Sequence, residues 1–175
     1  MKKTLILATL SLLLCSCAGR EYRIHGTVTE DSLEGVQIFL VTSGYEDSAH
    51  VDSVYIKDHK FEFTGRECRM ADLRVDWRKR DGIQNLLVAT EPGDIFVTIG
   101  RQSSGSGTPL NDSLEVWKNL TLDYNSKNFR YFTENAPKEK TDSLKRIYVD
   151  RTHEMARNVG EDSILGKFLL KLYPR

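Results

Sequence analysis

The stretch "DSVYIKDHKFEFTG", residues 52–65, consists of two short runs in which apolar and polar residues alternate. In the second run, Phe61 and Phe63 fall on one side of an extended chain and Glu62 on the other, because successive side chains of a strand point to opposite faces. The polar residues "KDHK" between the runs are typical of a tight turn. The stretch therefore predicts two neighbouring antiparallel strands, each with one buried face.

Alternation of this kind extends from Tyr22 to about Ile99. It forms seven runs, which are YRIHGTVT, VQIFLVT, HVDSVYI, KFEFTG, ADLRVDW, NLLVAT and DIFVTI. Turn sequences such as LEG, KRDG and EPGD separate the runs. A succession of short strands like this predicts an antiparallel β-sandwich or small barrel. The predicted core consists of Ile24, Val28, Ile38, Leu40, Val54, Phe61, Phe63, Leu73, Val75, Leu87 and Phe96.

Beyond Gly100 the apolar spacing becomes helical. The glycine- and serine-rich segment RQSSGSGTP is predicted to be a loop, and Asp112 with Glu115 three residues later resembles the capping box that begins a helix. One face of this helix carries Leu114, Trp117, Leu120, Thr121, Tyr124, Asn128 and Tyr131. Such spacing indicates a face that packs against the rest of the fold.

Two further helices are predicted to follow. The first opens after Asn135 and Pro137 and ends at Gly160, and the second begins at Asp162 or Ser163. Their apolar faces carry Leu144, Ile147, Tyr148, Met155 and Val159 in the first, and Leu165, Phe168, Leu169 and Leu172 in the second. The predicted fold class is therefore α+β, with an antiparallel β-domain of about seven strands at residues 22–108 and a segment of two to three helices at 109–175.

The N-terminus carries the features of an export signal. Lys2 and Lys3 precede an apolar segment, residues 5–14, which is too short to span a bilayer as a helix. The residues LCSC, 14–17, then match the lipobox of bacterial lipoproteins, in which an aliphatic residue stands three places before the acceptor cysteine and a small residue directly before it. We therefore predict a signal peptide at 1–16 and a tether at 17–21 with lipid on Cys17; the alternative is a plain secretory signal with an incidental cysteine.

Lipid on Cys17 would anchor the protein in a membrane, since two or more acyl chains such as palmitate hold a protein there durably. Ala18 follows, and no Asp stands in that place to indicate retention at the inner membrane, so we expect the outer membrane of a bacterial envelope. Cleavage and acylation would remove the thiols of Cys15 and Cys17. Cys68 is therefore predicted to be a small buried residue, and no internal disulfide is expected.

The composition argues against several function classes. Without Lys2 and Lys3 the chain has 23 basic and 25 acidic residues, so it lacks a basic field for nucleic acid. The SSGSGTP segment lacks the lysine of a phosphate-binding P-loop and the Gly-x-Ser-x-Gly of a hydrolase. The histidines, which are His25, His50, His59 and His153, lack the spacing of a helical metal site. We accordingly expect no cofactor, no metal and no enzymatic activity.

Two clusters of charged residues are weaker candidates for binding. Asp47, His50 and Asp52 could bind a cation from one loop, although solvated turn residues of this kind are common. The basic run at residues 78–80 could contact an anionic surface, although the aspartates on either side offset its charge. We expect solvated turns in both places.

Asp-Ser followed by an aliphatic residue or Ala occurs six times, where random composition would give on the order of one. The tripeptide resembles the acceptor motif for O-glycosylation of exported proteins in some envelope-rich bacteria. The candidate acceptors are Ser32, Ser48, Ser53, Ser113, Ser143 and Ser163, and of these Ser32 and Ser48 lie in predicted loops. The alternative is local structure, because Asp-Ser is also favoured in turns and at helix N-termini.

The succession YRIHGTV, GVQIFL, DSVYIKDHKFEFTG, LLVATEPGDIFVTI and SGTPLNDSLEVW resembles the domain of unknown function found at the N-terminus of many bacterial envelope lipoproteins. The resemblance covers Tyr22 to about Trp117, and in those proteins a helical segment and a thioredoxin-like domain of the peroxiredoxin type commonly follow. Where the family usually has Gly after Asp58, this chain has His59, which must adopt a tight-turn geometry that glycine takes more easily. The 175 residues contain no Cys-x-x-Cys, so oxidoreductase activity is not carried over.

Two functions remain as expectations. The first is a non-catalytic lipoprotein whose β-domain binds or scaffolds an envelope protein or glycan. The second is an accessory to, or the N-terminal half of, a thioredoxin-like thiol-disulfide oxidoreductase. Replacing Cys68 by Ser should be nearly silent under the first and should remove a mixed disulfide with an envelope thioredoxin under the second.

Overall fold

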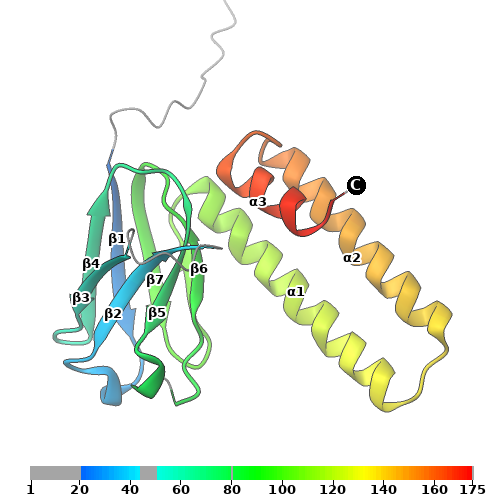
Figure 1. Ribbon diagram of the computed structural model, residues 1–175, viewed down its shortest axis with the longest axis horizontal. Helices are drawn as coiled ribbons and strands as arrows, with labels where there is room; N and C mark the ends of the chain where they lie inside the picture. Colours follow the sequence, from blue (N-terminus) through cyan, green and yellow to red (C-terminus); the bar gives the residue numbers. More distant parts are fainter. Residues whose placement is uncertain (1–20, 44–50, 80, 175) are drawn as a thin grey trace, which may run out of the picture.

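The computed structural model describes residues 21–43, 51–79 and 81–174. Two four-stranded sheets form a sandwich, and three helices follow it along the chain (Figure 1). The first sheet has the order β4 (Lys60–Gly65), β1 (Tyr22–Val28), β7 (Gly93–Ile99) and β8 (Ser104–Ser106), and the second has the order β3 (Val51–Tyr55), β2 (Gln37–Thr42), β5 (Met70–Val75) and β6 (Leu86–Ala89). The predicted α+β fold with a β-sandwich is confirmed, and the sheets of the described residues do not close into a barrel.

All seven predicted strands are present, but one pair departs from the predicted antiparallel arrangement. β1 pairs in parallel with β7, with Tyr22 opposite Gly93 and Val28 opposite Ile99. Parallel neighbours need a long connection, and here β2 to β6 form between the two strands. An eighth strand, β8, lies in the segment predicted to be a loop, because its sequence SGS has no apolar side chain that could reveal alternation.

Residues from both sheets form one apolar core. The prediction is confirmed for Ile24, Val28, Ile38, Leu40, Phe61, Phe63, Leu73 and Val75, which are buried, while Val54 is partly buried against them. The prediction for Phe96 is wrong, because β7 buries Ile95 and Val97 and so turns Phe96 outward, with 53% of its surface exposed. The prediction also assigned Leu87 to the wrong core, since this residue packs beneath the helices rather than between the sheets.

The turn between β3 and β4 has the geometry that the Asp-His pair was expected to require. Asp58 (φ 52°) and His59 (φ 58°) both adopt left-handed conformations. Their backbone N–H groups each donate a 2.9 Å hydrogen bond to the carboxylate of Glu34, which follows the short helix η1 (Asp31–Leu33). The bond from His59 and then that from Asp58 lower the pKa of Glu34. These bonds help to hold a turn that is conformationally unfavourable for non-glycine residues.

The helices are α1 (Pro109–Thr133), α2 (Lys138–Asn158) and α3 (Ile164–Leu172), and a short helix η3 (Trp77–Lys79) follows β5. The predicted start of α1 is wrong by one turn, because Pro109 occupies the first turn and Asp112 instead accepts a 2.9 Å hydrogen bond from Gly107 N–H. α3 begins as predicted, since Ser163 Oγ accepts a 2.9 Å bond from Gly166 N–H.

The helices attach to one side of the sandwich. A second apolar core contains Met70, Ala89, Leu114, Ala156, Leu165 and Leu169. α1 packs on β6 and β8, α3 packs on β5, and the α1–α2 hairpin extends away from the sheets (Figure 1). Three predicted packing residues are wrong, because Asn128 is exposed, Ile147 is 50% exposed and Leu172 is 46% exposed. Among the described residues we find no helix with the length and apolar character needed to cross a membrane.

Candidate functional site

The outward side chains of the first sheet form a surface that we call the open face. The helices pack on β5, β6 and β8, so no described helix covers the outer side of the central strands β1 and β7 of this sheet. A shallow depression of about 590 Å³ lies on this face. Its lining includes His25, Thr27, Glu62, Phe96, Thr98 and Ser106.

Phe96 stands at the centre of the open face. On one side the ring of His25 stacks on it, with ring centroids 5.2 Å apart and ring planes 18° apart, because the parallel pairing of β1 and β7 puts the two residues opposite each other. On the other side Gly107 (φ 102°) comes so close that an added Cβ would lie 2.7 Å from Phe96 Cδ2. The ring is therefore held in position while half of its surface stays in solvent.

Two polar pairs lie on the open face, and Lys60 on the edge strand β4 adds a positive charge to the lining of its depression. Nε2 of His25 lies 2.7 Å from Asp94 Oδ1, and Nε of Arg23 lies 3.2 Å from Glu62 Oε1. Hydroxyl groups occupy the neighbouring row, where Thr27 and Thr98 lie opposite each other with 3.3 Å between their Oγ1 atoms. The face thus combines an apolar ring with paired charges and hydroxyls, which suits contact with an uncharged ligand.

The alternation in the sequence indicated that Phe96 is exposed, although the hydrophobicity of the residue suggested burial. In the run DIFVTI, the apolar set Ile95, Val97 and Ile99 is complete by itself and fills the inner face of β7. Period-two alternation then leaves Phe96 on the outer face. Of the two alternating sets of side chains in this strand, one contains three aliphatic residues and the other contains the aromatic ring. Assigning the aliphatic set to the core would therefore have predicted that the ring is exposed.

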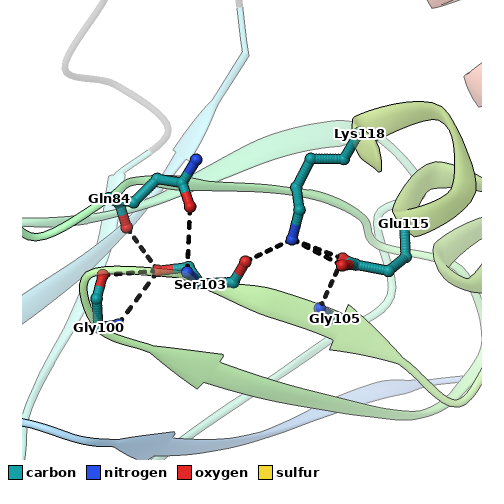
Figure 2. Close-up of polar contacts among 6 residues, drawn as sticks. All are labelled: Gln84, Gly100, Ser103, Gly105, Glu115 and Lys118. Carbon is teal, nitrogen blue, oxygen red and sulfur yellow. Dashed lines mark hydrogen bonds and ion pairs between the residues drawn. The ribbon is translucent and has the colours of Figure 1, made fainter. Parts of the chain in front are cut away.

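A second polar cluster joins α1 to the sandwich (Figure 2). Ser103 Oγ donates a 2.7 Å hydrogen bond to the Gln84 carbonyl and accepts one of 3.2 Å from Gly100 N–H. Lys118 Nζ donates to the Ser103 carbonyl and lies 2.7 Å from the carboxylate of Glu115. Figure 2 shows how Lys118 and Glu115 reach from the helix to the loop and strand around β8. Each residue labelled in the figure thus has at least one polar partner, as expected of a structural contact.

Asn111 completes this junction from within α1. It is 2% exposed, and its side chain pairs with both backbone groups of Ala89: Oδ1 accepts from the N–H (3.0 Å) and Nδ2 donates to the carbonyl (2.8 Å). Nδ2 also donates to Thr108 Oγ1 at 2.7 Å. The nearby cavity, into which Asn85 and Trp117 also project, has about 130 Å³, well below the volume of usual ligand pockets. We therefore regard the junction as structural and the open face as the candidate binding site.

Several predicted site residues lie outside the described residues, namely Cys17, Asp47, Ser48 and His50. Their remaining cation-site partner, Asp52, lies 3.6 Å from Arg69 Nη2. Among residues 21–43, 51–79 and 81–174, no group of three or more His, Cys, Asp or Glu side chains is arranged to hold a metal ion.

Cys68 is half-buried in the loop between β4 and β5, and it is disulfide-bonded in the whole chain. The expectation of no internal disulfide was made for the chain after cleavage and acylation at Cys17, so it stays a prediction for that form.

The described candidate glycosylation sites differ in accessibility. Ser32 on η1 and Ser53 on β3 are exposed, although Ser53 Oγ accepts a 2.8 Å bond from Gln37. Ser113, Ser143 and Ser163 are half-buried in or beside helices. Because Ser113 donates to the Pro109 carbonyl (2.8 Å) and Ser163 caps α3, these two hydroxyls serve the local structure.

In the basic run after β5, Arg78 is paired with its neighbour Asp76. The Arg78 guanidinium bonds the Asp76 carboxylate at 2.8 Å, and the backbone N–H of Arg78 donates to the same carboxylate at 3.0 Å. The side-chain bond and then the backbone bond lower the pKa of Asp76. Arg78 is therefore engaged locally, and Arg80 lies outside the described residues.

Comparison with known proteins assigns the sandwich to a family. A family model described as a domain of unknown function matches residues 22–114, which include all eight strands and the first turn of α1 with Asn111. No curated protein and no solved structure matches the chain significantly. The chain therefore belongs to the family described as "Domain of unknown function (DUF4369)".

Proposed function

We propose that this protein is a lipid-anchored lipoprotein of the bacterial envelope and that its sandwich is a non-catalytic binding module that uses the open face. The observation that carries the proposal is Phe96, an aromatic ring 53% exposed at the centre of an uncovered sheet and beside a depression of about 590 Å³. Aromatic residues are enriched in interaction surfaces relative to the rest of a protein surface, and binding sites are concave and combine apolar with a few polar groups.

The chemistry of the open face indicates the kind of partner. Since His25 pairs with Asp94 and Arg23 with Glu62, a strongly charged ligand would have to compete with these pairs. The ring of Phe96 and the hydroxyls of Thr27 and Thr98 can instead contact an uncharged surface. An envelope glycan or a neutral protein segment has this character.

The proposal is tested by photocrosslinking in living cells. A benzophenone side chain replaces Phe96 in the whole protein, and in a control it replaces Tyr55, an exposed aromatic residue on β3 of the other sheet (69% exposed). We expect an adduct of one dominant mass at position 96 and none at position 55; glycosidase sensitivity would identify a glycan. Equal adducts at both positions, or none at position 96, would contradict binding by the open face.

Lipid on Cys17 is supported by the lipobox LCSC at residues 14–17. Mass spectrometry of the protein purified from membranes should give an N-terminus at Cys17 with diacylglycerol and acyl groups, and membrane separation should place it with the outer membrane. An intact signal peptide, an unmodified Cys17, or a Cys17 joined to Cys68 by a disulfide would contradict the anchor.

O-glycosylation is proposed first at Ser32, because it is exposed on η1 and no structural role of its hydroxyl is evident in the described contacts. Replacing Ser32 by Ala should lower the intact mass by one glycan. Ser163→Ala is the matched control, since that hydroxyl caps α3 and should carry no sugar. An intact mass equal to that of the acylated polypeptide would exclude modification at every site.

The alternative function, an accessory to thioredoxin-like chemistry, depends on Cys68. Cys68→Ser should leave the adduct at position 96 unchanged if the open face is the binding site. If an envelope thioredoxin forms a mixed disulfide with the protein and this species disappears in Cys68→Ser, the redox function replaces the binding function.

A further inference from the structure

One face of α1 continues past the end of the sandwich. In the first half of the helix this face carries Asn111, Leu114, Glu115 and Lys118, which contact the sheets and the β8 loop. At 3.6 residues per turn the same face continues with Leu122, Asn125, Phe129 and Phe132, which we call the distal face. In Figure 1 this second half of α1 runs beside α2 and away from the sheets.

The distal face is apolar and exposed. Leu122 is 49%, Phe129 68% and Phe132 79% exposed. Three large apolar side chains in contact with water along two to three turns of one helix form a patch rather than scattered exposure. The fold supplies no partner for them among the described residues, because the sandwich contacts only the first half of α1.

The distal face also carries no charge. The charged residues of this half of α1 are Asp123, Lys127 and Arg130, and helical geometry places them on the opposite side, where Lys127 pairs with Asp123 at 2.7 Å. The polar neighbours of the patch on α1 itself are uncharged, namely Asn125, Ser126, Asn128 and Thr133, while Lys138 at the start of α2 places one positive charge at its edge. Depletion of charge around aromatic residues is the signature of the centre of a protein interface.

A hollow adjoins the projecting rings. It has about 590 Å³ and is lined by Phe129, Phe132, Asn128, Tyr131, Ala136 and Lys138, among others. The same surface thus offers both a projecting aromatic ring and a recess that can receive one. Two copies related by a twofold axis would each insert a ring into the recess of the other, which is the self-complementary arrangement of an isologous interface.

We propose that the distal face is a self-association surface, on which α1 of one copy packs antiparallel to α1 of a second copy. Two uncharged faces do not repel each other, so a second copy fits without a complementary charge pattern. An anionic membrane is the less suitable partner, because such surfaces attract clusters of Lys and Arg beside the apolar residues. A single cation, Lys138 of α2, lines the hollow beside the patch, whereas Lys127 and Arg130 lie on the far side of α1.

The size of the patch sets the strength of the dimer. Its three side chains expose roughly 400 Å² of apolar surface if a whole Phe is taken as about 200 Å². A standard stable interface buries about 800 Å² per partner, so the apolar centre supplies about half of it. The dimer is therefore weak, with a Kd on the order of 10 µM.

Sedimentation equilibrium of the whole protein in density-matched detergent tests this proposal. Between about 1 and about 100 µM, the mass should rise from one copy toward two. The double variant Phe129→Ser/Phe132→Ser should stay at one copy at every concentration. Its matched control, Val51→Ser/Tyr55→Ser, removes two exposed apolar residues from β3, outside the open face, and should dimerise as the unaltered protein does.

Two further kinds of variant test whether loss of the dimer has another cause, such as misfolding or a nonspecific effect. Phe132→Lys keeps a long exposed side chain and places like charges across the twofold axis, so it should also abolish the dimer while circular dichroism stays unchanged. A cysteine at Asn125 should crosslink two copies, whereas one at Asp123, on the opposite side of the helix, should not.

The proposal is overturned if the protein has the mass of one copy throughout, or if the double variant dimerises like the unaltered protein. It is also overturned if the protein stays single in solution but binds vesicles of phosphatidylglycerol and phosphatidylethanolamine through Phe129 and Phe132. That outcome would assign the distal face to a membrane. Because the open face is not altered in these variants, failure here leaves the proposed binding function intact.

Discussion

The two halves of α1 present the same helical face to different surroundings. In the first half, Asn111 and Leu114 are buried against the sheets, and Lys118 reaches the loop before β8. In the second half, Phe129 and Phe132 occupy equivalent positions on the helix and are mostly exposed. The spacing of residues along a helix therefore creates a face that can pack against a neighbour. How far the neighbouring sheets extend decides how much of that face is buried.

The chemistry of the two halves follows from this difference. Polar groups in the buried half are paired, because an unpaired buried donor or acceptor would cost free energy of folding. Polar groups in the exposed half are Asn and Ser side chains that water can satisfy. Substitutions in the first half should therefore change stability, and those in the second half should change association.

The largest effect is expected for Asn111→Ala. The variant leaves both backbone groups of Ala89 and the Thr108 hydroxyl without a partner in a buried place. We expect the free energy of unfolding to fall by about 2–3 kcal/mol, measured by urea denaturation. Asn125→Ala, an exposed Asn on the same face of α1, is the control and should change it little. A loss of the same size in both variants would contradict the comparison.

A smaller effect is expected at the ion pair shown in Figure 2. Lys118→Met removes the bond to the Ser103 carbonyl and the contact with Glu115, whose side chain is 27% exposed. We expect a loss of about 1 kcal/mol. A double-mutant cycle with Glu115→Gln separates the ion pair from the backbone bond, and a coupling energy of zero would show that only the backbone bond stabilises the junction.

An alkaline transition is expected at the end of α3. Burial and then the hydrogen bond to Tyr148 raise the pKa of Tyr173 from 10.0 to about 12. Below pH 10 the phenol is protonated in the folded and the unfolded chain, and between pH 10 and about 12 only the unfolded chain loses the proton. The packing of Tyr173 should therefore weaken as the pH rises through this range. Amide exchange of α3 measures it, and an identical transition in Tyr173→Phe would contradict the assignment.

The smallest effect on stability is expected for Phe129→Ser/Phe132→Ser. Since both rings are largely in solvent already, the free energy of unfolding should stay within about 0.5 kcal/mol when measured at a concentration where the protein is a single copy. A loss of several times this value would show that the distal half of α1 is part of the core. The comparison between the two halves would then fail.

Much of the fold could be predicted because it depends on short-range patterns. The seven predicted strands follow from alternation, the left-handed turn at Asp58 and His59 from two residues, and the start of α3 from the cap at Ser163. The short β8 could not be predicted, since its residues form a strand only because β7 lies beside them.

The candidate binding site on the open face was harder to predict from the sequence than the fold. Phe96 was assigned to the core because it is large and apolar, whereas the structure exposes it beside His25. These two residues are 71 positions apart, and only the parallel pairing of β1 with β7 brings them together. The polar contacts of Asn111 with Ala89 likewise join segments 22 residues apart.

The sequence by itself determined seven of the strands, the presence of the three helices, the place of the tight turn and the residues that resemble a lipid attachment signal, because each of these depends on a few neighbouring residues. Only the tertiary structure decided that β1 and β7 run in parallel, that Phe96 faces outward and that the distal face of α1 stays exposed among residues 21–43, 51–79 and 81–174. These features depend on which surfaces meet. Burial is a property of the assembled sheets and helices, so the same apolar residue becomes core or interaction surface according to where the neighbouring element ends.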